Sequence, residues 1–239
     1  MQVPLKFEFQ TNLAFASFFA GQNSHIVSLL HTLAHDGEEQ QIFIWGEQGC
    51  GKTHLLQACC QEAKSQAKDP FYLRFTSGRL PSVELLAGLE DVELVCLDDI
   101  QQLCGHPEWE RALFVFYNSH RQNSHKLLLS ANCPPKFLPF ELADLKTRMG
   151  WGLTLKLRPP ADQEIIEALT FKAHYLGFDL SPKVGGFLLR HYVHNLPSLW
   201  ALLDKIDHAT LAAQRKLTIP FLKQILSEET SISNNQPLD

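Results

Sequence analysis

The most constraining feature of this 239-residue chain is a glycine-rich loop that ends in a lysine and a threonine. It reads Gly46-Glu47-Gln48-Gly49-Cys50-Gly51-Lys52-Thr53 and lies between an apolar run and a helical pattern. In such a loop, glycines turn backbone N–H groups toward phosphate, the helix N-terminus favours negative charge, and the lysine adds a mobile cation. The pattern predicts a nucleoside phosphate site formed by Gly46, Gly49, Cys50, Gly51, Lys52 and Thr53, with Thr53 holding Mg²⁺.

Short apolar runs alternate with helical patterns around this loop, as in a parallel sheet covered by helices. The expected strands are residues 41–45, 71–75, 92–97, 126–130 and 153–157. The expected helices between them are residues 24–34, 52–68, 82–89 and 109–121. After Pro159 and Pro160 only helices are predicted, at about 162–175, 182–192, 197–216 and 219–228.

This order of elements predicts an α/β protein with a five-stranded parallel sheet in a three-layer αβα sandwich, followed by a small all-helical domain. The expected regions are an irregular arm at 1–12, the αβα domain at 13–158, the helical domain at 159–228 and a disordered polar tail at 229–239.

The composition excludes several classes of protein. A net charge of −5 gives no domain-wide positive field, so nonspecific wrapping of nucleic acid is not expected. The six cysteines form no Cys-x-x-Cys pair and several lie in apolar runs, which favours a reduced cytoplasmic protein. The sequence has neither a secretion signal nor a run of about 20 apolar residues that would span a membrane.

The eleven histidines raise the question of a metal site. Only His31 and His35 have the one-turn spacing of a helical ligand pair, and no neighbouring Glu or Cys completes a recognised set. We therefore expect no metal at this pair.

Two carboxylates follow the strand expected at 92–97, where sheets of this class place ligands. Asp98 would bind Mg²⁺ through water, and Asp99 could polarise an attacking water, although its side chain is one methylene shorter than that of Glu. A strand that ends in a solvated Asp-Asp turn is the alternative.

Asn132 follows the next buried strand and is expected beside these carboxylates. It could orient the attacking water or touch the terminal phosphate. A plain turn ahead of Pro134 and Pro135 explains the same residues equally well.

Arg148 is expected on a loop just before the edge strand at 153–157. From there its guanidinium could reach the nucleotide of a neighbouring molecule and stabilise charge on the transferring phosphoryl group. An ordinary surface arginine is the alternative.

Taken together, the loop and three further strings resemble the AAA+ module of the bacterial replication initiator DnaA. The strings are Leu97-Asp98-Asp99-Ile100-Gln101, Ser130-Ala131-Asn132 and Arg148-Met149-Gly150-Trp151-Gly152-Leu153. The resemblance covers about residues 13–226, and we expect neither a DNA-reading helix-turn-helix domain nor a separate N-terminal domain. With Phe15-Ala16-Ser17-Phe18-Phe19 and the stretch 213–221, the chain is similar to Hda-type regulatory inactivators of DnaA.

The resemblance implies a negative regulator of replication initiation. Arg148 would act in trans on ATP bound to DnaA, while Gln2, Leu5 and Phe7 resemble a peptide that binds the DNA polymerase sliding clamp. The implied ligands are ADP or ATP with Mg²⁺, the implied partners are DnaA and the clamp, and DNA would be reached only through the clamp. A cytoplasmic protein, associated with the nucleoid through the clamp and compatible with a homodimer, fits this picture.

An autonomous AAA+ ATPase, such as a helicase-loader-like or DnaA-like remodelling factor, is the alternative function, and a small-molecule P-loop kinase is a third. One departure favours the regulator. Pro197 stands where AAA+ proteins usually carry a phosphate-contacting lid arginine, so we expect slow hydrolysis and little discrimination between ATP and ADP. The segment Phe19-Ala20-Gly21-Gln22-Asn23 resembles the family's adenine-lining segment, although an ordinary turn explains it as well.

Overall fold

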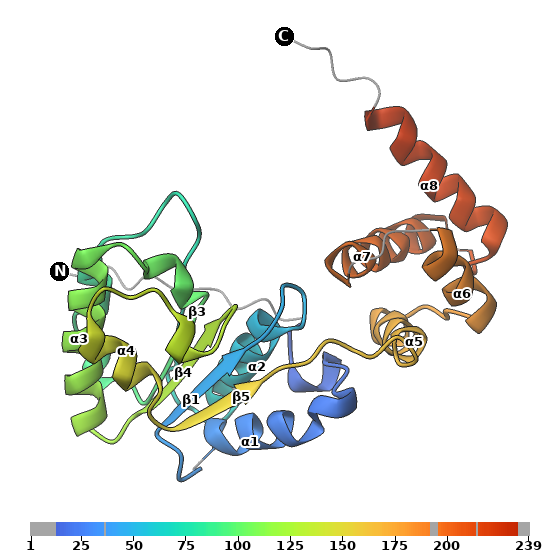
Figure 1. Ribbon diagram of the computed structural model, residues 1–239. Helices are drawn as coiled ribbons and strands as arrows, with labels where there is room; N and C mark the ends of the chain where they lie inside the picture. Colours follow the sequence, from blue (N-terminus) through green and yellow to red (C-terminus); the bar gives the residue numbers. More distant parts are fainter. Residues whose placement is uncertain (1–12, 36, 192–195, 214, 234–239) are drawn as a thin grey trace. The chain divides into compact units, whose positions relative to one another are not determined.

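The structure is a computed structural model that describes residues 13–35, 37–191, 196–213 and 215–233 (Figure 1). The chain divides into two compact units, Met1–Pro159 and Pro160–Asp239. The residues of the expected N-terminal arm, including Gln2, Leu5 and Phe7, lie outside the described residues.

The first unit contains a five-stranded sheet in the order β2-β3-β4-β1-β5, in which all pairings are parallel. The strands are β1 Gln41–Trp45, β2 Phe71–Arg74, β3 Leu94–Asp98, β4 Lys126–Ala131 and β5 Leu153–Lys156. The central strands β1, β3 and β4 are almost entirely buried, as expected for parallel strands covered on both faces. The predicted α/β fold class is confirmed.

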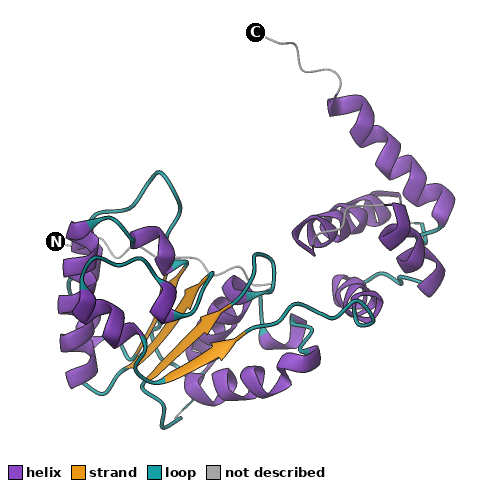
Figure 2. Ribbon diagram, in the orientation of Figure 1, coloured by secondary structure: helices purple, strands orange, loops and turns teal. Residues whose placement is uncertain are grey.

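Helices cover both faces of this sheet (Figure 2). On one face, α1 Ser24–Ala34 and α2 Lys52–Ser65 form a core with Ile42 and Ile44 of β1. On the other face, α3 Pro107–Gln122 and α4 Ala143–Met149 form a second core with Phe43 of the same strand. The alternation of side chains along β1 therefore separates the two cores and produces the three predicted layers.

Two local predictions in this unit are corrected. The helix expected near 82–89 is replaced by two 3-10 turns, η3 Val83–Leu86 and η4 Leu89–Asp91, because Gly88 between them has a left-handed φ of 85°. Arg148 lies in α4 rather than on a loop. This helix has only seven residues, too few for a clear period, and the buried Leu145 and Met149 hold it against the sheet domain.

The second unit consists of α5 Ile165–Leu176, α6 Pro182–His191, α7 Leu196–Ala213 and α8 Ile219–Ser233. A separate apolar core joins them, with Leu169, Leu188, Leu203 and Leu222 among its buried members. Residues 229–233, assigned from the sequence to a disordered tail, continue α8 instead. Extending an existing helix costs less conformational entropy per hydrogen bond than starting a new one. Polar residues can therefore prolong α8.

The described part of the chain contains no helix whose length and apolar character would allow it to cross a membrane.

Candidate functional site

The phosphate loop connects the end of β1 to the start of α2, and its glycines are required by close contacts. A Cβ on Gly46 would lie 2.4 Å from the carbonyl oxygen of Leu157. Gly51, with a φ of 100°, would place a Cβ 2.5 Å from the ring of Phe18. Other residues would therefore distort the loop. The loop leads directly into the N-terminus of α2, a position that favours an anion.

Lys52, the first residue of α2, is almost completely buried inside the curve of the loop. Its Nζ donates to the carbonyl oxygens of Gly46 at 2.8 Å and Glu47 at 3.0 Å. Burial raises the pKa of the Cys50 thiol in the same loop, although Lys52 opposes the shift. The thiol is therefore neutral at physiological pH, and the ammonium supplies the positive charge of the loop.

Asp98, at the end of β3, is fully buried and accepts hydrogen bonds from three hydroxyl groups. Thr53 Oγ1 donates to Oδ2 at 2.7 Å, Tyr72 OH donates to Oδ2 at 2.9 Å, and Ser130 Oγ donates to Oδ1. Burial, and next the charge of Asp98, raise the pKa of Tyr72, so its hydroxyl stays protonated and donates. Thr53 and Asp98, the two residues predicted to hold Mg²⁺, thus lie in direct contact.

Asp99 has a left-handed φ of 60°, and its carboxylate is engaged with neighbouring side chains. Arg74 Nε donates to Oδ2 at 3.0 Å, and Gln101 Nε2 donates to Oδ1 at 3.1 Å. Burial lowers the pKa of Arg74, but Asp99 and then Asp98 outweigh this effect and leave the pKa raised. The residue predicted to polarise water is therefore paired with a cation.

Asn132 is exposed just beyond β4. Its backbone N donates to Gln101 Oε1 at 3.3 Å, and Gln101 also contacts Asp99. The structure thus brings Asn132 to the same edge of the sheet as the two carboxylates.

The segment before α1 lies against the phosphate loop. Phe18 covers Gly51, and the side chains of Gln22 and Asn23 donate to the carbonyl oxygens of Pro159 at 3.0 Å and Arg158 at 2.8 Å. The segment that resembles an adenine-lining turn is therefore anchored beside the loop and at the end of the first unit.

Arg148 lies at the opposite end of the sheet from the phosphate loop. Gln41, the first residue of β1, donates from Nε2 to the carbonyl oxygens of Arg148 at 3.3 Å and Met149 at 3.0 Å. The loop begins at Gly46, and a rise of about 3.3 Å per residue puts it about 16 Å further along the strand. The structure does not bring Arg148 to the other predicted site residues.

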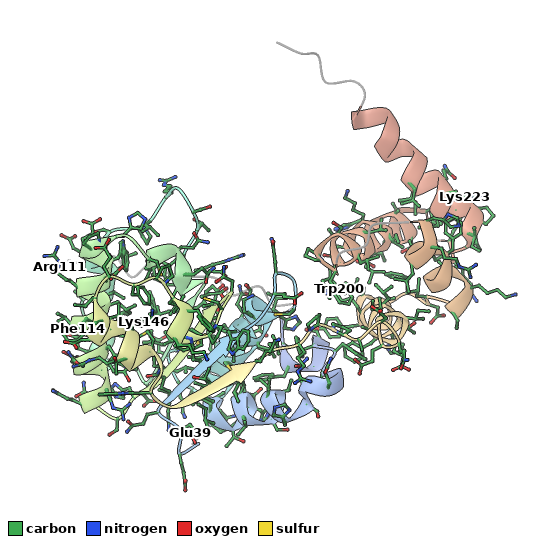
Figure 3. The ribbon with its side chains drawn as sticks, in the orientation of Figure 1. Glu39, Arg111, Phe114, Lys146, Trp200 and Lys223 are labelled. Atoms are coloured by element: carbon green, nitrogen blue, oxygen red, sulfur yellow. The ribbon has the colours of Figure 1, made fainter. Side chains whose placement is uncertain are left out.

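The Arg148 guanidinium rests on aromatic rings. It lies 4.2 Å from the ring centroid of Phe114 on α3 and 5.6 Å from that of the partly exposed Trp151. Figure 3 labels Phe114 on α3 and Lys146 on α4, on the same side of the sheet. Among the described residues, no carboxylate forms an ion pair with Arg148. Its charge is therefore positioned by stacking and not neutralised.

In the second unit, Pro197 is the second residue of α7. Proline is tolerated in a first helical turn because the N–H groups there have no intrahelical partner. Pro197, expected at the position of the lid arginine, therefore fits the helix but brings no charge.

Two family models match this chain. The bacterial DnaA ATPase domain matches residues 9–156, and the Hda lid domain matches residues 162–226. The chain belongs to the DnaA-related AAA+ family and is of the Hda type. The resemblance drawn from the motifs is thereby confirmed.

Solved structures agree with this assignment at the level of the fold. Domain III of DnaA from Thermotoga maritima is similar with a TM-score of 0.73 at 21% identity, over 92% of this Hda-type chain and 98% of that chain. AMPPCP-bound DnaA from Aquifex aeolicus gives a TM-score of 0.73 at 19% identity, over 93% and 71%. A replication initiator DnaA bound to AMPPCP and single-stranded DNA gives a TM-score of 0.71 at 21% identity. That match covers 83% of this chain and 65% of the initiator chain. The chain thus spans about two thirds of that initiator's length.

Three residues of this Hda-type site were not identified from the sequence. Tyr72 and Arg74 reach the carboxylates because β2 pairs with β3 in a register that aligns Arg74 with Asp98. Phe114 reaches Arg148 from a helix some 30 residues earlier in the chain. Only a predicted register between the two strands would have identified Tyr72 and Arg74. No local sequence signal indicates Phe114.

Proposed function

We propose that this DnaA-related AAA+ protein is a negative regulator of replication initiation that promotes hydrolysis of ATP bound to DnaA. The observation that carries the proposal is the position of Arg148, at the far end of β1 from its own phosphate loop. An arginine so placed cannot serve the nucleotide of its own chain, yet its charge is not neutralised by a described carboxylate.

The stacked guanidinium suits action on a second molecule. Its contacts with Phe114 and Trp151 limit the side-chain freedom that is lost when it reaches a partner. In the nucleotide site of DnaA, Arg148 would stabilise the charge that develops on the phosphoryl oxygens during hydrolysis.

The protein's own loop fits a nucleoside phosphate, ADP or ATP. The glycine loop would present backbone N–H groups to phosphate oxygens, Lys52 supplies charge, and Thr53 with Asp98 would hold Mg²⁺. Bound Mg²⁺ would neutralise phosphate charge. Asp99 would act as the water-polarising group and Asn132 as its neighbour, but the pairing of Asp99 with Arg74 supports weak intrinsic hydrolysis.

The sliding clamp is the proposed recruiting partner. Gln2, Leu5 and Phe7 would dock as an extended peptide, a mode in which apolar side chains fill a pocket at low cost. Such a contact concentrates the protein on DNA near DnaA, so that a second weak contact suffices. DNA contact is then indirect, and the proposed location is the cytoplasm, with association with the nucleoid through the clamp.

The test is hydrolysis of ATP preloaded on DnaA, measured with this protein and with the clamp either loaded on DNA or absent. We expect stimulation only with the loaded clamp. A variant lacking residues 1–8 should lose stimulation while keeping its thermal unfolding midpoint. Stimulation that is independent of the clamp would remove the clamp from the proposal, and no stimulation under either condition would overturn the proposal.

The alternative is an autonomous AAA+ ATPase, such as a helicase-loader-like or DnaA-like remodelling factor. The complete phosphate loop and the contact between Thr53 and Asp98 favour it. Its signature is multiple-turnover ATP hydrolysis by this protein without DnaA, abolished by K52A. A homodimer, detected by light scattering, would fit either function.

A further inference from the structure

Two histidines and a glutamate meet on α1 and α2, outside the candidate nucleotide site. His31 lies in the last turn of α1, His35 is the residue that ends it, and Glu62 comes from α2. Glu62 Oε1 is 2.9 Å from Nε2 of His35 and 3.6 Å from Nε2 of His31. One potential ligand atom from each residue lies within 4.8 Å of the other two.

The histidine pair was expected to have no neighbouring Glu or Cys, and the structure corrects this by placing Glu62 beside it. Glu62 is 27 residues from His35 in the sequence. Only the packing of α1 on α2 brings the carboxylate to the pair.

We propose that His31, His35 and Glu62 bind a divalent transition-metal ion of the zinc type. Two imidazoles and one carboxylate are a ligand set of three-residue zinc sites, with the remaining position taken by water. At metal–ligand distances of about 2.1 Å, tetrahedral ligand atoms lie about 3.4 Å apart. The two separations from Glu62 bracket this value, and the ligand atoms of the two histidines lie within 4.8 Å of each other.

The surroundings of the cluster favour a cation and hold its ligands in place. The ligands lie at the C-terminal end of α1, where the helix dipole is negative. The ring of Phe15 packs at 5.5 Å from the ring of His31. Imidazole nitrogen selects Zn²⁺, Ni²⁺ or Co²⁺ over Mg²⁺ and Ca²⁺, so this site would not compete for the magnesium of a nucleotide.

The side chain of His31 is 51% exposed, which leaves the proposed fourth position accessible to solvent. A water molecule or a ligand from another molecule can occupy it. The proposal concerns ion binding alone and is independent of the regulatory function proposed above.

The test is calorimetric titration of Zn²⁺ into tag-free, EDTA-treated, nucleotide-free protein, repeated with H35Q and E62Q. We expect one equivalent to bind the wild type and at least tenfold weaker binding by each variant. H25Q, which changes an exposed histidine on the same helix, is the matched control and should bind as the wild type does.

Cysteines are competing ligands, and Cys104 and Cys133 are only partly buried. Co²⁺ separates the two cases, because thiolate ligation produces a charge-transfer band that imidazole and carboxylate ligation lack. We expect a visible Co²⁺ spectrum without that band, displaced by Zn²⁺ and lost in E62Q. A thiolate band, or an affinity unchanged in both H35Q and E62Q, would overturn the proposal.

Zn²⁺ should also raise the thermal unfolding midpoint of the wild type and of H25Q but not that of H35Q. Unchanged circular dichroism of apo H35Q and E62Q verifies that the fold is intact. If either variant unfolds, H31Q at the half-exposed position replaces it, with the same tenfold loss expected.

Discussion

The two ends of β1 hold charged groups in opposite ways. At the carboxyl end, Lys52 and Asp98 are buried, and each is satisfied by several hydrogen bonds from within the chain. At the amino end, Arg148 is only partly buried and is held by aromatic faces. A buried charge is costly unless it is fully paired, whereas a stacked cation keeps its charge available to another molecule. The first end is thus suited to a small ligand and the second to a partner protein.

The largest effect is expected from a substitution at the amino end of β1, where Arg148 lies (the partner end). R148A should lower the clamp-dependent hydrolysis of DnaA-bound ATP by about a thousandfold or more, the effect typical of an arginine supplied in trans. Binding of the variant to the clamp and to ADP should be unchanged. R79A, at an exposed position in the loop after β2, is the matched control. Full stimulation by R148A would show that this end of β1 does not act on DnaA.

The next largest effect is expected from a substitution at the carboxyl end of β1, where the phosphate loop lies (the nucleotide end). G51A forces a side chain into a left-handed conformation and into Phe18, which should weaken ADP binding by at least about tenfold and cost roughly 1–2 kcal/mol of stability for the backbone alone. Equilibrium nucleotide binding and chemical unfolding measure both. G51A should cost less stability in an F18A background than in the wild type, because F18A removes the collision but not the backbone strain. An equal cost of G51A in both backgrounds would assign the whole loss to the backbone.

Removing the cation from Asp99 sharpens the comparison, because it tests whether the ion pair with Arg74 limits ATP hydrolysis at the nucleotide end. R74A removes the cation from Asp99 and should raise intrinsic ATP hydrolysis by up to about tenfold, less than the full effect of a general base because Gln101 still binds the carboxylate. The increase should disappear when D99N is added. R74K, which retains a positive charge, should give a smaller increase. A decrease in R74A would mean that Arg74 supports hydrolysis.

Removing the aromatic support is expected to have a modest effect at the partner end. F114A deletes the closest ring beneath Arg148, and a cation–π contact at an accessible site is worth about 0.5–1 kcal/mol. DnaA-stimulated hydrolysis should fall by roughly two- to fivefold on this estimate. F114L retains apolar volume without the ring and should resemble F114A. Wild-type activity in F114L would show that Phe114 acts through packing alone.

The last prediction concerns the stability of the helix that carries Phe114. Burial lowers the pKa of His120 on α3 from its ordinary value of 6.5 to about 4. As pH falls, His120 is protonated in the unfolded chain before it is protonated in the folded protein. The stability contributed by neutral His120 is therefore present above pH 6.5 and is lost as pH falls toward 4. H120Q should flatten that part of the pH dependence in urea unfolding. An unchanged slope would exclude His120 as its source.

Local sequence predicted the elements that surround the nucleotide end well. The observed bounds of β1 and α1 match the predicted residues, because a continuous apolar run and a clear helical period are both local signals. The same reasoning missed α4, whose seven residues depend on burial of Leu145 and Met149. The segment after β2 was likewise predicted to be one helix from its apolar pattern. The left-handed backbone at Gly88 divides it into two 3-10 turns.

The sequence by itself determined the phosphate loop, the parallel αβα architecture and the family, because these depend on residues that are consecutive or regularly spaced. Only the tertiary structure decided which distant side chains meet. Strand order brings Tyr72 and Arg74 to the carboxylates, α3 places an aromatic face under Arg148, and α2 brings Glu62 to the histidine pair. Such contacts follow from the packing of whole elements, and the sequence spacing of the residues involved contains no record of them.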